Sequence, residues 1–143
     1  MKPTIQGVLE TALYVDDLVR SQAFYEGHFG FKGLLADERM CALEVSEAPR
    51  QVLLLFRKGG STKGEETPGG FIPPHDGTGK LHMAFRIDAA DLEAWRKYFE
   101  QHGIAIESEV RANNGYSIYF RDPDGHLIEL ATAGLWDISK DEG

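Results

Sequence analysis

The chain has 143 residues, of which 42% are hydrophobic, and a formal net charge of −8 at pH 7. This size and composition are typical of one domain with a real core and exclude a second large domain. Nucleic acid and anionic membrane surfaces need a basic face, so the charge disfavours both as partners. The start MKPTIQG has no apolar signal or anchor region, and one cysteine, Cys41, excludes an internal disulfide framework. We therefore expect a cytoplasmic protein in which Cys41 is a packed structural thiol.

The first half of the chain predicts a strand, a helix and further strands. The segment VLETALYVDDLVRSQAFYEGHFGF is typical of a strand, a turn at Asp16 and Asp17, and an amphipathic helix that ends at Gly30. The runs MCALEV and QVLLLFR that follow are strand-like. We therefore expect one module over residues 5–58.

Residues 59–80 form a connector rich in glycine and proline. The stretch RKGGSTKGEETPGGFIPPHDGTGK holds 7 glycines and 3 prolines and shows no apolar periodicity. It lacks the Gly-x4-Gly-Lys-Ser/Thr order of a phosphate-binding loop. The composition favours a mobile linker over a ligand clamp, although long loops in compact domains often act as lids.

The second half repeats the pattern of the first over residues 81–133. KLHMAFRIDAADLEAWRKYFEQHGI predicts a strand, a turn at Asp88, a helix cap near Asp91 and a helix that ends at Gly103, and YSIYFRD and GHLIELA predict strands. We expect His126, in the DPDG turn, to be exposed. In the tail, residues 134–143, Leu135 and Trp136 are expected to pack over a sheet edge or a partner subunit.

The two halves superpose at a nearly constant offset. Glu10 pairs with His82, Gly30 with Gly103 and Leu54 with Glu129, at offsets of 72, 73 and 75 residues by subtraction. Since strand residues alternate between faces, Glu10, His82 and Glu129 all lie on the side of their strands opposite the helices. A divalent cation would satisfy two carboxylates and an imidazole together. Each residue also has a plainer explanation, namely a surface glutamate, a core histidine with satisfied hydrogen bonds and a carboxylate that caps a loop.

These motifs resemble those of the vicinal oxygen chelate superfamily, which includes glyoxalase I, bleomycin- and fosfomycin-resistance proteins and extradiol dioxygenases. The resemblance rests on DDL...FY...FGF, on the HMAF strand and on DPDGHLIEL, and spans nearly the whole chain. It implies an α+β fold in which paired βαβββ modules form a curled mixed sheet around a cleft, so that residues 1–143 make one domain.

The resemblance also implies a bound divalent metal. The ligand positions of metal-binding members map onto Glu10, Leu54, His82 and Glu129. Leucine cannot bind metal, and many members have histidine at the position of Glu10. The implied site is therefore one histidine and two carboxylates, with open positions for a bidentate substrate. Manganese, iron, magnesium, zinc, nickel and cobalt all remain candidates.

The implied function is a metal-dependent enzyme, a lyase or isomerase or related Lewis-acid catalyst, that chelates vicinal oxygens of a small substrate. Glu129 or Glu10 would also act catalytically by leaving the metal to shuttle a proton. Two alternatives stay open: a metal-free protein that sequesters a drug, and an extradiol ring-cleaving dioxygenase. The family further implies a homodimer. Candidate substrate contacts are Arg86, His75, Tyr14, Tyr119, Leu54 and Phe56.

Overall fold

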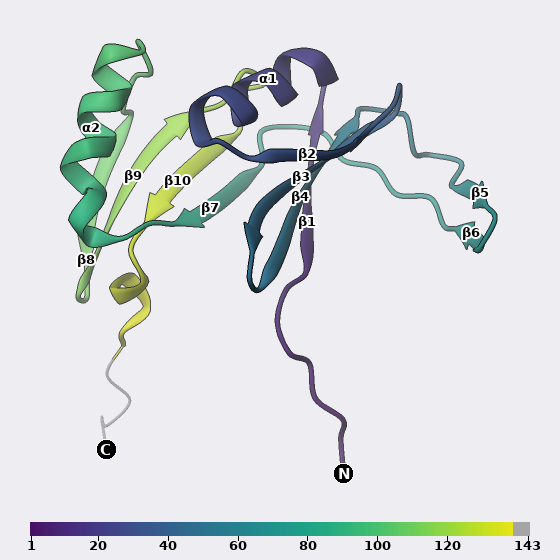
Figure 1. Cartoon of the computed structure of the whole chain (residues 1–143), viewed down its shortest axis with the longest axis horizontal. Helices are drawn as coiled ribbons and strands as arrows, with labels where there is room; N and C mark the ends of the chain where they lie inside the picture. Colours follow the sequence, from purple (N-terminus) through teal and green to yellow (C-terminus); the bar gives the residue numbers. More distant parts are fainter. Residues whose placement is uncertain (139–143) are drawn as a thin grey trace. The chain divides into compact units, whose positions relative to one another are not determined.

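The computed structural model describes residues 1–138, which fall into two compact units: unit 1, Met1–Gly79, and unit 2, which begins at Lys80. No helix among these residues has the length and apolar character needed to cross a membrane. Each unit contains one α-helix and its own four-stranded sheet (Figure 1). Unit 1 is built from β1 (Glu10–Val15), α1 (Leu18–Phe29), β2 (Lys32–Ala36), β3 (Met40–Glu47), β4 (Arg50–Arg57), β5 (Glu65–Thr67) and β6 (Gly70–Ile72).

Unit 2 repeats the element order of unit 1. Its elements are β7 (His82–Arg86), the 3₁₀ helix η1 (Ala89–Asp91), α2 (Leu92–Gln101), β8 (Ser108–Ala112), β9 (Gly115–Arg121), β10 (Leu127–Ala131) and the 3₁₀ helix η2 (Ala133–Trp136). The two sheets have the orders β1-β4-β3-β2 and β7-β10-β9-β8. In each, the first pair of strands is parallel and the other pairs are antiparallel. This confirms an α+β fold of βαβββ modules with mixed sheets.

Strand register confirms the repeat residue by residue. Ala12 lies opposite Leu54 in unit 1, and Ala84 lies opposite Glu129 in unit 2. Two residues earlier on the first strand of each unit stand Glu10 and His82. Leu54 is therefore the structural counterpart of Glu129, as the sequence offset predicts.

The helices begin and end close to the predicted residues. Asp17 caps α1 by accepting a hydrogen bond from the Arg20 amide, and Gly30 ends it at φ 69°. In unit 2 the capping differs from the prediction, because Asp91 makes no side-chain capping bond. Asp88 instead accepts from the Ala90 amide, since the short helix η1 precedes α2.

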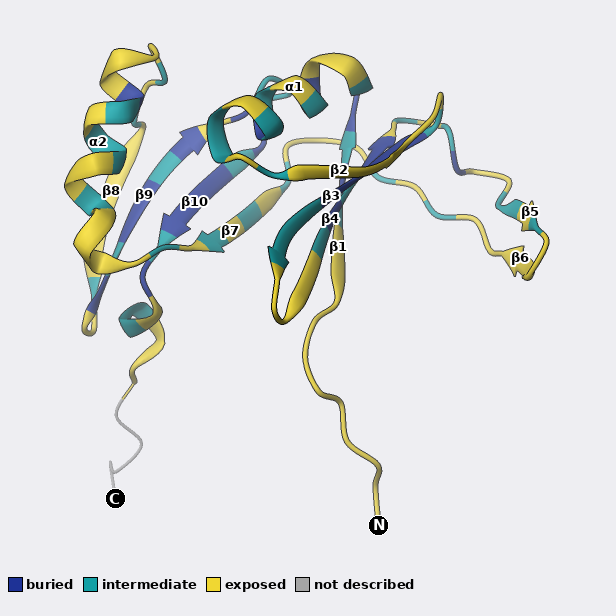
Figure 2. Ribbon diagram, viewed as in Figure 1, coloured by how far each residue is buried: buried dark blue, intermediate teal, exposed yellow. Residues whose placement is uncertain are grey.

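The core of each unit lies between its helix and its sheet. Figure 2 shows β10 as mostly buried, and Phe99 of α2 packs edge-on against Phe120 of β9 with ring centroids 4.9 Å apart. In unit 1 the helix-facing strand residues are buried in the same way, among them Cys41, whose free thiol is a packed core group as predicted. Other members of these two cores are Leu13, Val15, Leu43, Leu53, Leu55, Ile118, Ile128 and Leu130.

Two loops differ from what their composition suggests. The connector carries its own hairpin, β5 paired with β6, and its mobility stays a prediction. The prediction of an exposed His126 is wrong. His126 is fully buried because its ring nitrogen Nδ1 accepts a hydrogen bond from the Leu81 amide and its own amide donates to Asp122. These bonds fasten the DPDG turn to the chain entering β7. A polar turn composition does not reveal such long-range partners.

The tail agrees with its prediction only in part. The backbone of Leu135 packs against the turn between β8 and β9, where its carbonyl accepts a hydrogen bond from Asn113. Trp136 is 77% exposed. The remainder of the predicted tail, residues 139–143, lies outside the described residues.

Candidate metal centre

Glu129 is a nearly buried carboxylate in the middle of strand β10. The residue is 4% exposed, and its neighbours Ile128 and Leu130 are buried in the core. The pairing of β10 places Glu129 between Ala84 of β7 and Tyr119 of β9. An ionised carboxylate in such surroundings costs several kcal/mol, roughly, unless cations or hydrogen-bond donors meet it.

Two side chains on the same sheet face meet this carboxylate. The Ser117 hydroxyl donates a hydrogen bond to Oε2 of Glu129. The ring nitrogen Nε2 of His82 lies 3.3 Å from Oε1. The carboxylate is therefore held from one side by a hydroxyl and approached from the other by an imidazole.

The backbone fixes how the His82 imidazole is protonated. Its Nδ1 lies 2.8 Å from the carbonyl oxygen of Leu127, and a carbonyl can only accept a hydrogen bond. Nδ1 therefore carries a hydrogen, and in the neutral imidazole Nε2 presents a lone pair. That lone pair faces a carboxylate oxygen, an arrangement that is repulsive unless a positive charge joins the two atoms.

A divalent cation fits this pair of donors. Ligand atoms on adjacent corners of an octahedron, each about 2.2 Å from the ion, lie about 3.1 Å apart. The observed 3.3 Å between Nε2 and Oε1 is close to that separation. The Nδ1 hydrogen bond to a backbone carbonyl is also the usual outer partner of a metal-binding histidine. A protonated His82 would also stabilise the carboxylate, by forming an ion pair with it. In that state His82 would contribute only its positive charge and would not bind a metal.

Glu10, the third predicted ligand, begins strand β1 in unit 1. It is exposed, and it pairs with Val52 of β4 on the face opposite α1. Within residues 1–138, no group of three or more histidine, cysteine, aspartate and glutamate side chains gathers in metal-binding geometry. Unit 2 thus brings together two of the three predicted ligands, and the full set stays a prediction.

Tyr119 lies beside the pair on the same face. Its ring stacks with that of His82 at a centroid distance of 6.3 Å. Burial first, and then the charge of Glu129, raise the pKa of the Tyr119 phenol. Tyr119 therefore stays protonated at neutral pH and can donate a hydrogen bond to an anionic group near Glu129.

The corresponding face of unit 1 is apolar. Leu54 and Phe56 lie there with Met40 and Ala42, packed as one cluster. Tyr14 stacks on Phe56, and its hydroxyl oxygen is 2.6 Å from Nδ1 of His75. The structure therefore brings four of the predicted substrate contacts together in unit 1: Tyr14, Leu54, Phe56 and His75.

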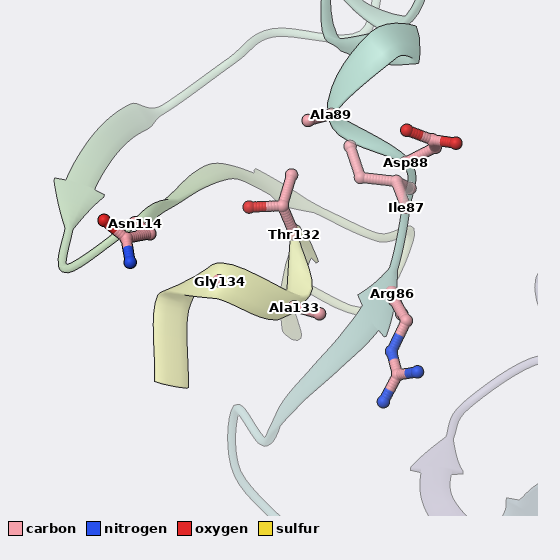
Figure 3. A pocket seen from close by; sticks show the side chains of 8 residues that line it. All are labelled: Arg86, Ile87, Asp88, Ala89, Asn114, Thr132, Ala133 and Gly134. Carbon is pink, nitrogen blue, oxygen red and sulfur yellow. The ribbon is translucent and has the colours of Figure 1, made fainter. Parts of the chain in front are cut away.

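Arg86 ends strand β7 on the face that carries His82. It is exposed, and it stands at the rim of a pocket of about 510 Å³ in unit 2. Figure 3 shows its guanidinium extending away from Thr132 and Asn114, while the side chain of Ile87 turns the other way. The pocket is lined by Arg86, Ile87, Asp88, Ala89, Asn114, Thr132, Ala133 and Gly134.

Comparison with known proteins identifies the family. The model of the Glyoxalase/Bleomycin resistance protein/Dioxygenase superfamily matches residues 7–130. The chain belongs to this superfamily. The metallothiol transferase FosB of Bacillus licheniformis is 31% identical over 135 residues, which cover 93% of this chain and 79% of the relative.

Solved structures of superfamily members agree. A lactoylglutathione lyase from Agrobacterium tumefaciens superposes with a TM-score of 0.84 at 34% identity, covering 96% of this chain and 100% of the other. The fosfomycin resistance protein FosX from Mesorhizobium loti superposes with a TM-score of 0.62 at 25% identity, covering 94% and 98%. Proteins named for quite different reactions thus share the fold of this superfamily member.

The superfamily motifs did not reveal every residue around Glu129. Ser117 is not among the residues that these motifs single out, yet its hydroxyl donates a hydrogen bond to the carboxylate. Ser117 lies two residues before Tyr119 on the same strand. Because strand residues alternate between faces, this spacing predicts that both lie on the face of Glu129. No local signal exists for Arg39, whose side chain links the connector to the turn between β2 and β3.

Proposed function

We propose that this superfamily member is a metal-dependent enzyme that chelates vicinal oxygens of a small substrate. Glu10, His82 and Glu129 would hold one divalent cation. The observation that carries the proposal is the approach of His82 Nε2 to within 3.3 Å of the buried Glu129 carboxylate, while Nδ1 is held by the Leu127 carbonyl. Such a pair needs a positive charge between its members, and a divalent ion supplies it.

A bound cation would supply Lewis-acid stabilisation of an oxyanion that forms on the substrate. The protein prepares for this with its own residues. Ser117 fixes the rotamer of Glu129, and the Leu127 carbonyl fixes the tautomer of His82. Glu10 or Glu129 would also leave the metal and act as a base that accepts a proton.

The relatives support enzymatic activity. FosB and FosA are named as transferases, and the structural neighbour at 34% identity is named as a lyase. The word metallothiol in the name of FosB also supports a metal. We assign no particular transferred group or substrate from these names, because one fold serves many reactions.

The predicted substrate contacts have a different character in each unit. In unit 2, Arg86 and Tyr119 offer donors to an anionic oxygen. In unit 1, Leu54 and Phe56 offer an apolar wall with Tyr14 and His75 at one end of it. The donors of unit 2 suit an anionic oxygen, and the wall of unit 1 suits an apolar group.

Metal content tests the proposal. Purified protein is loaded with Mn²⁺, Ni²⁺ or Zn²⁺, desalted and analysed by atomic emission beside Glu10→Ala, His82→Ala and Glu129→Ala. We expect about one ion per chain in the parent and loss in all three variants, with circular dichroism unchanged. His102→Ala is the matched control, because His102 stacks on Tyr98 of α2 and not on the site. A fully loaded Glu129→Ala protein would contradict the proposal.

A second function is favoured by one observation, the apolar residue Leu54 at the position equivalent to Glu129. Leu54 packs against a cluster of Met40, Ala42 and Phe56, which suits sequestration of a hydrophobic ligand without metal. Tight binding of an aromatic drug by metal-free protein, together with no bound ion under any loading, would select this function instead.

A further inference from the structure

Two side chains meet Glu129 from opposite sides along one diagonal of the sheet in unit 2. On β7, His82 pairs with Leu127, two residues before Glu129. On β9, Ser117 pairs with Ala131, two residues after Glu129. Because side chains two residues apart on a strand share a face, His82, Glu129 and Ser117 form one diagonal row. The two oxygens of the Glu129 carboxylate therefore have different neighbours.

One of these oxygens is beside the imidazole, and the other is held by the hydroxyl. Nε2 of His82 lies 3.3 Å from Oε1, whereas the Ser117 hydroxyl donates its hydrogen to Oε2. A serine hydroxyl carries one hydrogen and an ionised carboxylate can only accept, so the direction of this bond is fixed. Oε2 is thus engaged by the protein itself, and Oε1 is the oxygen next to the histidine nitrogen.

The hydrogen bond between Ser117 and Glu129 is shielded from water. Ser117 is fully buried and Glu129 is almost so. Away from water, a hydroxyl bonded to a carboxylate is among the stronger hydrogen bonds of a protein. Oε2 should therefore stay with Ser117 when another group approaches Oε1.

The histidine side of the carboxylate is open by comparison. The residue directly opposite Glu129 on β7 is Ala84, whose side chain is a single methyl group. The side chain of His82 is 51% exposed, so an ion can reach Nε2 and Oε1 from solvent. One oxygen of Glu129 is thus held inside the sheet face, and the other is presented to whatever binds beside His82.

We propose that Ser117 sets the metal selectivity of this centre by restricting Glu129 to one ligand oxygen, Oε1. The inference rests on the proposed metal-dependent function, which it deepens, and it needs only residues of unit 2. Ca²⁺ takes about six to eight oxygen ligands and often uses both oxygens of a carboxylate. Transition metal ions such as Mn²⁺ accept imidazole beside a single carboxylate oxygen. With Oε2 engaged by Ser117, the centre favours Mn²⁺ over Ca²⁺.

A purely structural serine would behave differently. A hydroxyl that only stabilised the buried charge would strengthen the binding of every divalent ion to the same degree. A hydroxyl that withholds Oε2 affects the two ions unequally, because its removal offers Ca²⁺ a second oxygen while Mn²⁺ loses a ligand that was held in place. The ratio of the two dissociation constants therefore separates these roles.

Competition between Mn²⁺ and Ca²⁺ tests the proposal. Free Mn²⁺ is followed by its EPR signal, first as purified protein is added and then as Ca²⁺ displaces the bound ion. We expect Ser117→Ala to weaken Mn²⁺ binding about tenfold and to lower the preference for Mn²⁺ over Ca²⁺ by about tenfold or more. Ser117→Thr keeps the hydroxyl and should keep the preference of the parent. Circular dichroism checks that each variant is folded.

Ser21 supplies the matched control. It is a fully buried serine of α1, and its hydroxyl oxygen has no hydrogen-bond partner among the described residues. Ser21→Ala removes the same atom from a core position without releasing a carboxylate. Both dissociation constants of Ser21→Ala should therefore equal those of the parent.

The outcomes separate this inference from the proposed function. A parent protein that binds no Mn²⁺ removes the proposed function and the inference with it. A parent that binds Mn²⁺ but does not prefer it to Ca²⁺ overturns the inference alone, and so does a Ser117→Ala protein that keeps the preference of the parent. Loss of both ions from Ser117→Ala also overturns it, because Ser117 would then support the whole centre and not its selectivity.

Discussion

At the scale of single residues, burial decides which side chains can react. Glu129 is buried with a hydroxyl and an imidazole against it, so its charge is directed at a partner. Cys41 is buried among apolar neighbours with no such partner, and burial first, then Glu26, raise the pKa of its thiol to about 11. The same loss of water thus leaves a carboxylate that needs a polar partner in one place and a thiol that is a poor nucleophile in the other.

We expect Cys41 to resist thiol reagents. Its pKa of about 11, against an ordinary value of 9.0, leaves roughly 100-fold less thiolate at pH 8 than a free cysteine has. The rate of reaction with Ellman's reagent should rise about tenfold per pH unit from pH 8 to pH 10. Protein unfolded in urea is the control and should react quickly. A rate that levels off near pH 9 in the folded protein would contradict this expectation.

At the scale of elements, glycines mark where backbones touch. The turn between β8 and β9 packs directly on η2, since a Cβ at Gly115 would lie 1.9 Å from the Leu135 amide nitrogen. Apart from its chain neighbours and the backbone of its own helix, no atom lies within 4 Å of the place that a Cβ at Gly27 of α1 would occupy. Gly115 is required because two elements touch there. Gly27 makes no such contact and only lowers the stability of its helix.

These two glycines should respond in opposite directions to alanine. Gly115→Ala must separate the turn from η2, so we expect it to lower the free energy of unfolding by about 1–3 kcal/mol. Gly27→Ala should raise it by about 1 kcal/mol, because alanine favours the helix. Urea unfolding followed by circular dichroism measures both. Equal effects of the two substitutions would show that the contact at Leu135 does not constrain the turn.

At the scale of the whole molecule, each unit repeats one plan of strand, helix and three strands. In unit 1 the edge strand β2 is exposed along its whole length, and it presents Leu34 and Leu35 in succession. The hairpin strand β6 likewise presents Phe71 and Ile72. Uncovered edge strands and paired apolar side chains favour association with a second copy. A homodimer, and a single domain built from the two modules, stay predictions.

We expect light scattering after size exclusion to give twice the chain mass of 15.9 kDa at micromolar concentration. Leu35→Lys places a charge on the edge strand, a device that blocks edge pairing, and should shift the mass toward that of one chain. Val19→Lys, at an exposed position of α1, controls for added charge. A parent protein that elutes as a single chain at all concentrations would contradict the homodimer.

The sequence by itself determined the repeat, the helix ends and the strand faces. Alternation and periodicity are local properties, so Glu129 and His82 could be placed on one face before any contact was known. Their counterparts Glu10 and Leu54 followed from the offset between the halves. The family motif in DPDGHLIEL added a chemical expectation for that face.

Only the tertiary structure decided which polar groups meet. Three hydrogen bonds join residues that are 12 to 45 positions apart: Ser117 to Glu129, the Leu81 amide to His126, and Arg39 to Ser61 of the connector. Each depends on strand pairing or on a loop that folds back onto its unit. The connector appeared to be a mobile linker because its composition is local information. Its hairpin and its contacts with Arg39, Phe56 and Tyr14 depend on other parts of unit 1, and no sequence period encodes contacts of that kind.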